Sequence, residues 1–306
     1  MTEIAHDVVE VAESPSAVTI GNFDGVHRGH QVLLRRAVDA AHDRGVRSVA
    51  ITFEPHPAAV LRPGSEPPRL QTLEDRVAEL GNAGVDLVLV LPFTEELAAL
   101  SPQAFVHRVL VDRLQAVRVV VGTNFRFGHR AAGDVVTLVE EGEVHGFGTE
   151  AVTILELDGI PLSSSAVRAR LAEGDIDWVT RALGRPHHLP GTVVPGDGRG
   201  RTIGVPTANL DVPGDLVVPP NGVYAGHVRH AGERFAAVTN VGVRPTFDGA
   251  ARTVETHLLD VDLDLYGRSV DVTFEHRLRG EQRFDGPEQL VARIRTDIDE
   301  ARVLLG

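Results

Sequence analysis

Short apolar runs alternate with segments of helical periodicity over the first 184 residues, and this alternation limits the fold more than any other feature. Apolar residues recur at helical spacing over residues 33–41, and Gly45 is expected to end this helix. Ser101 followed by Pro102 predicts the start of another helix. Such alternation is typical of a parallel sheet covered by helices. We therefore predict a doubly wound α/β domain over residues 1–184, with ligands at the carboxyl ends of its strands. The expected strands are residues 17–21, 48–53, 85–93, 117–122 and 150–157.

The pattern changes after residue 184, where short strands are interrupted by glycine, proline and asparagine. Val270, Val272 and Phe274 alternate with polar neighbours, and residues 229–233 have the composition of a hairpin turn. Near the end, Leu290, Ile294 and Ile298 recur every fourth residue, as in an amphipathic helix. Residues 185–306 therefore predict an antiparallel β-barrel or sandwich closed by a helix.

The composition is that of a globular protein, with 306 residues of which 42% are hydrophobic. Apolar runs stay well short of the roughly 20 residues that a membrane span needs, and the first residues lack the pattern of a signal peptide. We therefore expect no membrane association and a cytoplasmic location. The absence of cysteine excludes disulfides, thiolate metal sites and a cysteine nucleophile.

The formal net charge of −13 argues against nucleic acid as a partner, because binding a phosphate backbone requires an extended basic face. A chain of this charge that binds smaller anions must do so with local devices. Helix N-termini, single arginines and bound divalent cations are the available ones.

The stretch TIGNFDGVHRGHQVLLRRA, residues 19–37, places His27 and His30 where an expected strand turns into an expected helix. The free N–H groups of a helix N-terminus attract anionic oxygen, and two imidazoles there can donate hydrogen bonds to a reacting phosphate. Gly21, Gly25 and Gly29 allow the backbone to approach a nucleotide. Two alternatives are polar loop histidines and part of a zinc site, although no third ligand at recognisable spacing accompanies them.

The motif GNFDGVHRGHQ resembles the HxGH-type signature of the nucleotidylyltransferase superfamily, and in particular the adenylyltransferase module of bacterial bifunctional riboflavin kinase/FAD synthetases. The segments TFEPHP, VVVGTNFRFGHRAAGD and LSSSAVRARL follow in the corresponding order. The resemblance implies that His27, His30 and Arg168 stabilise the charge of the reacting phosphates. It also implies an ATP site formed by Gly21, Asn22, Phe23, Gly29, Ser164, Ser165 and Arg168.

The same resemblance implies flavin contacts from His56, Asn124, Phe125 and Arg126. Residues 124–126 follow an expected strand, where ligand contacts occur in such sheets. Alternatively, Phe125 and Phe127 belong to the core, His56 is a structural loop residue, and the serines only cap a helix. The chain has Asn124 where the family often has aspartate and Leu162 where isoleucine or valine is usual, which leaves the reaction class unaffected.

The second half resembles riboflavin kinase through GTVVPGDGRGRTIGVPTANL, NGVYAG, TNVGVRPTF, VETHLLD and LDLYG. The resemblance implies that Thr207 and Asn209 hold Mg²⁺ and that Glu255 is the catalytic base. Hydroxyl and amide oxygens suit this hard cation, and a carboxylate can accept a hydroxyl proton. The glycine-rich loop, with Gly196, Gly198 and Arg201, is expected to bind phosphates. Taken alone, the same residues are consistent with a plain turn and a surface strand.

These motifs together predict an enzyme that phosphorylates riboflavin to FMN in its second half and adenylylates FMN to FAD in its first. Its partners are the small molecules riboflavin, FMN and ATP, and a homo-oligomer remains open. One alternative is a nucleotidylyltransferase for another phosphorylated compound. The other is a flavin-binding sensor without catalysis.

Overall fold

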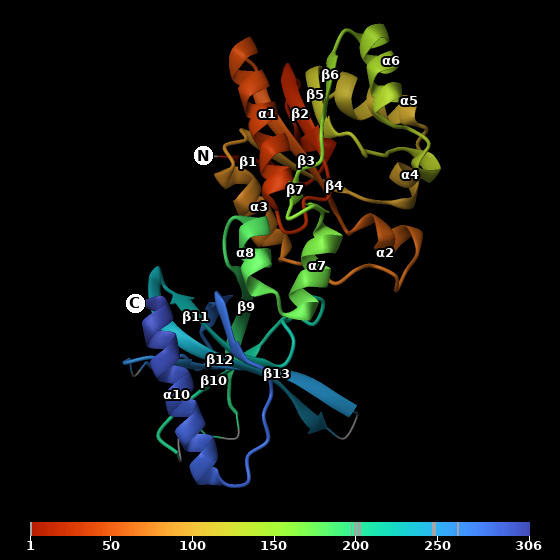
Figure 1. Cartoon of the computed structure of the whole chain (residues 1–306). Helices are drawn as coiled ribbons and strands as arrows, with labels where there is room; N and C mark the ends of the chain where they lie inside the picture. Colours follow the sequence, from red (N-terminus) through yellow and green to blue (C-terminus); the bar gives the residue numbers. More distant parts are fainter. Residues whose placement is uncertain (1, 197, 199, 201–202, 247–248, 262) are drawn as a thin grey trace. The chain divides into compact units, whose positions relative to one another are not determined.

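The computed structural model describes residues 2–196, 198, 200, 203–246, 249–261 and 263–306 (Figure 1). The chain divides into two compact units, residues 1–164 and residues 165–306, called unit 1 and unit 2 below. Among the described residues, no helix combines the length and the apolar character needed to cross a bilayer.

Unit 1 is built on a six-stranded parallel sheet of order β1-β4-β3-β2-β5-β6. The chain order of the strands reverses between β2 and β5, which pair in parallel over Ser16 to Thr19. This confirms the predicted doubly wound sheet. The strands are β1 Glu3–Ala5, β2 Ser16–Ile20, β3 Arg47–Glu54, β4 Leu87–Pro92, β5 Ala116–Gly122 and β6 Gly148–Val152.

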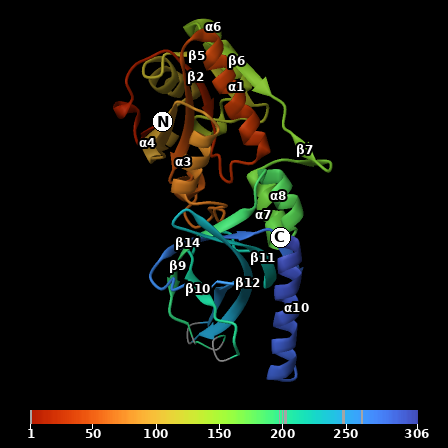
Figure 2. The same cartoon turned by 90° about the vertical axis from the view of Figure 1, so that its left-hand side faces the viewer.

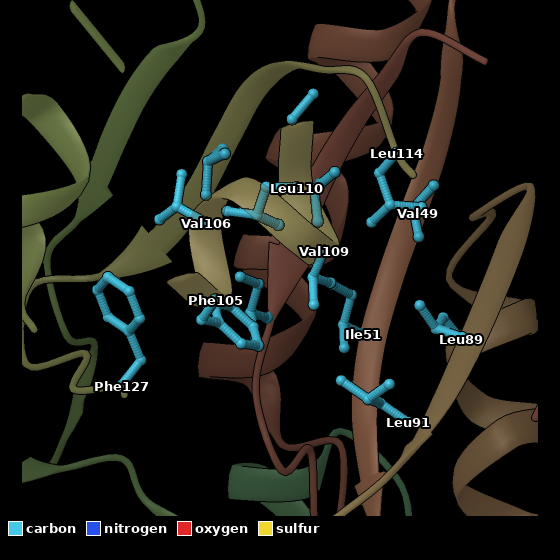
Figure 3. Packing of buried hydrophobic residues seen from close by; sticks show 14 of the residues in the cluster. Val49, Ile51, Leu89, Leu91, Phe105, Val106, Val109, Leu110, Leu114 and Phe127 are labelled. Atoms are coloured by element: carbon cyan, nitrogen blue, oxygen red, sulfur yellow. The ribbon is translucent and has the colours of Figure 1, made fainter. Parts of the chain in front are cut away.

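Helices cover both faces of this sheet because its strands are apolar on both sides. On one face, Leu34 of α1 and Leu80 of α3 pack with Ala50 and Val88 of the sheet. On the other face, the helical segment from α5 onward packs against β3 and β4, as Figure 3 shows. The α-helices are α1 Arg28–Arg44, α2 Pro57–Leu61, α3 Leu73–Asn82, α4 Glu95–Ala98, α5 Pro102–Phe105 and α6 Val135–His145. Helix α5 continues into a π-helix over Val106–Val111, and short 3₁₀ turns occupy Val8–Glu10 and His129–Ala131.

Most of the predicted boundaries in unit 1 are confirmed, with two corrections. Gly45 ends α1 in the left-handed conformation (φ 63°), and Ser101 caps α5 with Pro102 at its first turn. The strand expected over residues 150–157 is wrong in extent, because β6 ends at Val152 and β7, Glu156–Leu157, pairs with β8, Ile160–Pro161. The sequence also gave no signal for β1, a three-residue strand at the edge of the sheet.

Unit 2 contains the predicted antiparallel barrel. Strand pairing runs β12-β13-β10-β9-β14-β11, and β11 pairs with β12 to close the ring, while β15 also pairs with β11. Val270, Val272 and Phe274 are all buried, which confirms the predicted alternation. The strands are β9 His187–Val194, β10 Ala208–Asp211, β11 Gly222–His230, β12 Glu233–Thr246, β13 Gly249–Leu258, β14 Ser269–Phe274 and β15 His276–Arg279.

The hairpin between β11 and β12 turns through Ala231 and Gly232, which both have positive φ (50° and 85°), as a two-residue turn of this type requires. The closing helix α10, Pro287–Leu305, lies along the barrel (Figure 2) and buries Ile298 and Ala301. Leu290, one of the three residues that predicted this helix, is 36% exposed, so the helix packs through its later turns.

Helices α7, Ser164–Glu173, and α8, Ile176–Leu183, follow the sheet in the chain. By contacts they group with unit 2 apart from Ser164, and α8 packs on β9 and β15. The functional boundary at residues 184 and 185 stays a prediction.

Candidate active sites

The two candidate loops of unit 1 lie side by side at the carboxyl edge of the sheet. Strand β2 leads into the loop of residues 21–27, and its neighbour β5 leads into residues 123–128. These strands flank the point where the strand order reverses, and nucleotides bind at that point in doubly wound sheets. The fold therefore brings His27 and Asn124 to one edge of the sheet.

His27 and His30 form a stacked pair at the start of α1. His27 is the N-cap residue, and its Nδ1 accepts a hydrogen bond from the His30 backbone N–H at 3.3 Å. The two rings stack with centroids 3.7 Å apart and an interplanar angle of 19°, while the ring of Phe23 meets His30 edge-on. A Cβ at Gly29 would lie 3.0 Å from Cε1 of His27, so only glycine leaves this ring its full space.

Burial keeps both imidazoles neutral. It lowers the pKa of His27 from its ordinary 6.5 to about 4, and it lowers the pKa of His30 well below its ordinary value, with the neighbouring His27 as a second cause. Since Nδ1 of His27 is an acceptor, its proton resides on Nε2. Nδ1 of His30 is buried and lacks a hydrogen-bond partner within the described residues. Two neutral rings with unused hydrogen-bonding atoms can bind a phosphate but are poor bases near neutral pH.

An ion pair between the buried Arg76 and the partly exposed Glu54 supports the backbone of this loop. The carbonyl of Asn22 accepts hydrogen bonds from the Thr52 hydroxyl and from Nη1 of Arg76, both at 3.0 Å. Arg76 is only 5% exposed, and its Nη2 lies 2.5 Å from Oε2 of Glu54 at the end of β3. Arg76 thus links the loop after β2 to the end of β3.

His56 lies on the loop after β3, where it caps α2 by accepting the N–H of Ala58 at Nδ1 (3.1 Å). Its Nε2 is 3.4 Å from the side-chain nitrogen of Asn22. The structure therefore brings His56 to the loop that precedes the histidine pair.

The next residues of the loop are also anchored. The carboxylate of Asp24 accepts the backbone N–H of Leu70 at 3.0 and 3.2 Å, and the Asp24 carbonyl accepts the hydroxyl of Ser164 at 2.8 Å. Phe23 adopts positive φ (51°), an uncommon conformation for an aromatic residue, which these contacts help to hold. Ser164 therefore contacts the backbone of this loop, and its contact with ATP stays a prediction.

Residues 124–126 follow β5 as expected, but two of their side chains are engaged by the protein. Phe125 stacks on Phe127 with centroids 5.5 Å apart and packs against the core. Nη1 of Arg126 lies 2.8 Å from Oδ2 of Asp134, the N-cap of α6. Their contact with a flavin stays a prediction, as does that of Asn124.

Arg168 lies one turn inside α7, where its Nη2 donates to the Ser165 hydroxyl at 3.4 Å. Both residues belong to unit 2 by contacts. Their participation in the site of unit 1 stays a prediction.

In unit 2 the candidate residues form a row across three strands. Asn209 of β10 pairs with Glu255 of β13, and Glu255 pairs with Asn240 of β12. Directly opposed residues project from the same face of a sheet with Cβ atoms about 5 Å apart. The adjacent Thr256 is buried and bonded to Thr239 inside the barrel, so Glu255 points to the outer face, where it is half-buried.

The glycine-rich loop packs against Asn209 and Thr207. A Cβ at Gly196 would lie 2.1 Å from Nδ2 of Asn209, and one at Gly200 would lie 3.3 Å from Oγ1 of Thr207. Gly198 has φ +69°, which favours glycine. The predicted phosphate contact Arg201 lies outside the described residues. A glycine-rich loop beside two candidate oxygen ligands fits a Mg²⁺–nucleotide site, because this ion takes further ligands from water and phosphate.

No group of three or more histidine or acidic side chains within the described residues is arranged to hold a metal ion. A metal at Thr207 and Asn209 would therefore depend on the nucleotide for much of its coordination.

Comparison with known proteins identifies both units. The model of the FAD synthetase family matches residues 9–166, and that of the riboflavin kinase family matches residues 183–305. A bifunctional riboflavin kinase/FMN adenylyltransferase from Pseudomonas fluorescens is 44% identical over 287 residues, which cover 94% of this chain and 92% of the relative. The chain belongs to the family of bifunctional riboflavin kinases/FMN adenylyltransferases.

Other members of this family are also similar from end to end. The bifunctional riboflavin kinase/FMN adenylyltransferase of Escherichia coli K12 is 38% identical over 98% of this chain and 96% of its own length. A crystal structure from Streptococcus pneumoniae, described as a macrolide-efflux protein, has a TM-score of 0.90 and 30% identity, with 98% of each chain covered. We take only the fold from that likeness.

Sequence reasoning missed several residues that contact or lie beside the candidate sites. Asp24 and Glu54 lie inside the quoted motifs but were given no role, and Asn240 lies inside TNVG. Arg76 had a usable signal, since it falls on the apolar stripe of its helix between Leu73 and Leu80. A charge on such a stripe indicates a buried partner.

Proposed function

We propose that the chain converts riboflavin to FAD in two steps, each driven by ATP, with the kinase step in unit 2 and the adenylyl step centred on the histidine pair of unit 1. The observation that carries the proposal is that one polypeptide contains both site geometries and matches two-activity relatives over nearly its whole length. In the first step ATP phosphorylates riboflavin to FMN in unit 2. In the second step another ATP adenylylates FMN to FAD, with pyrophosphate as the other product, in unit 1.

In the kinase step, Glu255 accepts the proton of the riboflavin 5′-hydroxyl while that oxygen attacks the γ-phosphorus of ATP and ADP leaves. Its half-buried position on the outer face of the barrel, beside Asn209, supports this role. Thr207 and Asn209 would hold Mg²⁺, and a bound Mg²⁺ would supply positive charge next to the phosphates of ATP. Gly196 and Gly198 let the loop backbone approach those phosphates.

In the adenylyl step, an oxygen of the FMN phosphate attacks the α-phosphorus of ATP and pyrophosphate leaves. No protein nucleophile is needed, because the phosphate of FMN is already the nucleophile. His27 and His30 donate hydrogen bonds to the phosphates as their charge redistributes, and Arg168 adds a guanidinium. The low pKa of His27, about 4, supports a neutral donor and argues against a base.

Mixing the purified protein with riboflavin, MgCl₂ and ATP, and separating the flavins by chromatography, tests both steps. We expect FMN to appear first and FAD to follow. If neither product forms while ATP is in excess, the proposal is wrong. We extend the proposal to a cytoplasmic location, which suits an ATP-dependent chain without cysteine, and light scattering on the same sample tests for a homo-oligomer.

A further inference from the structure

His257 lies next to the kinase site but has no role in the mechanism above. It follows Glu255 by two residues in β13, so both side chains project from the outer face of the barrel. Nδ1 of His257 lies 2.7 Å from the carbonyl oxygen of Pro206. A carbonyl oxygen can only accept, so Nδ1 carries the proton and donates this bond.

The strand register places Glu255 and His257 opposite the two predicted metal ligands. Asn209 pairs with Glu255 and Ala208 pairs with Thr256. Continuing the same register by one residue puts Thr207 opposite His257. The two predicted metal ligands, Asn209 in β10 and Thr207 just before it, therefore face a carboxylate and an imidazole on β13.

Thr207 needs a support of this kind because it precedes the paired part of β10. In the described part of the chain, the pairing of β10 with β13 begins at Ala208, and Pro206 has no N–H to donate. The loop before it is tied back on itself, since the Val205 N–H donates to the carbonyl of Gly200 at 2.9 Å. The bond from His257 fixes the carbonyl that directly precedes Thr207 to the strand that carries Glu255.

We propose that His257 is a positioning residue of the kinase site. Its Nδ1–H holds the Pro206 carbonyl and thereby sets the distance between the Thr207 hydroxyl and Glu255. The inference rests on the proposed function, since it assigns to Thr207 and Glu255 the roles given above.

Three substitutions of His257 test the inference. His257→Asn keeps an N–H donor close to the position of Nδ1, His257→Gln moves the donor about one bond length farther out, and His257→Ala removes it. We expect His257→Ala to lower kcat/KM of riboflavin phosphorylation about tenfold, which corresponds to about 1.4 kcal/mol. We expect His257→Asn to stay within about threefold of the unchanged protein and His257→Gln to resemble the alanine variant.

His230 provides a matched control. It also lies on the barrel and also contacts a carbonyl through Nδ1, that of Ser269 at 3.0 Å, but away from Glu255. We expect His230→Ala to leave phosphorylation unchanged. FMN adenylylation should stay constant in all four variants.

Calorimetric titration with Mg²⁺–ATP adds a readout other than turnover, and we expect several-fold weaker binding to His257→Ala than to His257→Asn. Equal binding and equal kcat/KM across the His257 variants would overturn the inference, as would an equal loss in His230→Ala. If His257→Ala does not fold, the difference between the Asn and Gln variants decides. If the unchanged protein makes no FMN, the proposed function itself is wrong, a result distinct from unaffected His257 variants in an active enzyme.

Discussion

The two units position their candidate catalytic side chains in different ways. Unit 1 collects its residues in loops at the ends of parallel strands, so His27 and His30 are close in sequence and share one helix N-terminus. Unit 2 aligns Asn209, Glu255 and Asn240 across three antiparallel strands, where register brings together residues that are far apart in the chain. A site of the first kind depends on loop backbone, and a site of the second kind depends on strand pairing.

The candidate residues of the two units also differ in how deeply they are buried. The histidine pair of unit 1 follows a loop that the buried Arg76 supports, so its environment is largely fixed before any ligand binds. Glu255 of unit 2 is half-buried on an outer face beside a glycine-rich loop. We expect the first site to be sensitive to remote packing changes and the second to changes in the loop above it.

The largest expected effects come from variants that strongly reduce one activity and leave the other unchanged. Glu255→Gln should lower riboflavin phosphorylation about 10³-fold, because it removes the base and keeps the shape, while FMN adenylylation is unchanged. His30→Ala should lower adenylylation about 10²-fold and leave phosphorylation unchanged. Initial rates with riboflavin and with supplied FMN measure both. Loss of both activities in either variant would show that the units are not independent.

The next test removes the hydrogen bond from Arg76 to the Asn22 carbonyl in the loop after β2. Arg76→Met leaves Glu54 without its main partner, and we expect adenylylation to fall about tenfold to 100-fold as the Asn22 backbone shifts. We expect unfolding free energy to fall by at most about 3 kcal/mol, because Glu54 keeps 32% of its side chain exposed. Urea titration and FMN turnover measure the two effects.

Two further variants sharpen that result. Adding Glu54→Gln to Arg76→Met should recover stability but not rate, since it removes the unpaired charge and does not restore the bond to Asn22. Arg35→Met, at an exposed position of α1, should change neither. Full adenylylation in Arg76→Met would show that the ion pair only stabilises the fold.

A smaller effect is expected from the loop of unit 2. Gly196→Ala places a methyl group where the Asn209 amide now lies, so the amide must rotate away, and we expect kcat/KM of phosphorylation to fall about tenfold. Gly214→Ala is the matched control, because a Cβ there meets nothing within 4 Å. Comparable rates for the two variants would contradict the assignment of Asn209.

The last prediction concerns stability alone and is a pH dependence that both units share. The folded-state pKa values of His27 and His187, about 4 and about 3, lie below the ordinary 6.5 because both rings are buried. As the pH falls from 6.5 toward 4, the unfolded chain binds protons that the folded chain does not. Stability is therefore complete above pH 6.5 and decreases below it, by at most about 1.4 kcal/mol per pH unit for each histidine.

Urea midpoints at pH 7.5 and pH 5.5 measure this slope. His27→Gln should flatten the slope, and His42→Gln, at an exposed position of α1, should not. An unchanged slope in His27→Gln would mean that this ring is protonated in the folded protein.

The sequence predicted the fold well where the physical signal is local. Apolar strands covered on both faces, Gly45 as a helix stop and the Ala231–Gly232 turn all follow from short-range chemistry. The edge strand β1 was missed because three residues give no periodicity, and the extent of β6 was overestimated because apolar residues continue past its end.

The candidate sites were less predictable from the sequence than the fold. The histidine pair is visible as a motif, whereas the contacts of Arg76 and His257 depend on which loops and strands become neighbours. Phe125 and Arg126 followed the correct strand, but their engagement with Phe127 and Asp134 is decided by packing and by the cap of α6. Tertiary pairing of this kind leaves little trace in the order of residues.

The hydrogen bond from the Ser164 hydroxyl to the Asp24 carbonyl bears on how the first unit could be produced as a separate fragment. A fragment ending before Ser164 would contain the whole parallel sheet, yet the loop preceding the histidines would lose an anchor. To obtain adenylylation without the kinase, one would therefore retain the chain through this serine and through Arg168 of α7, which the proposed adenylyl step also uses.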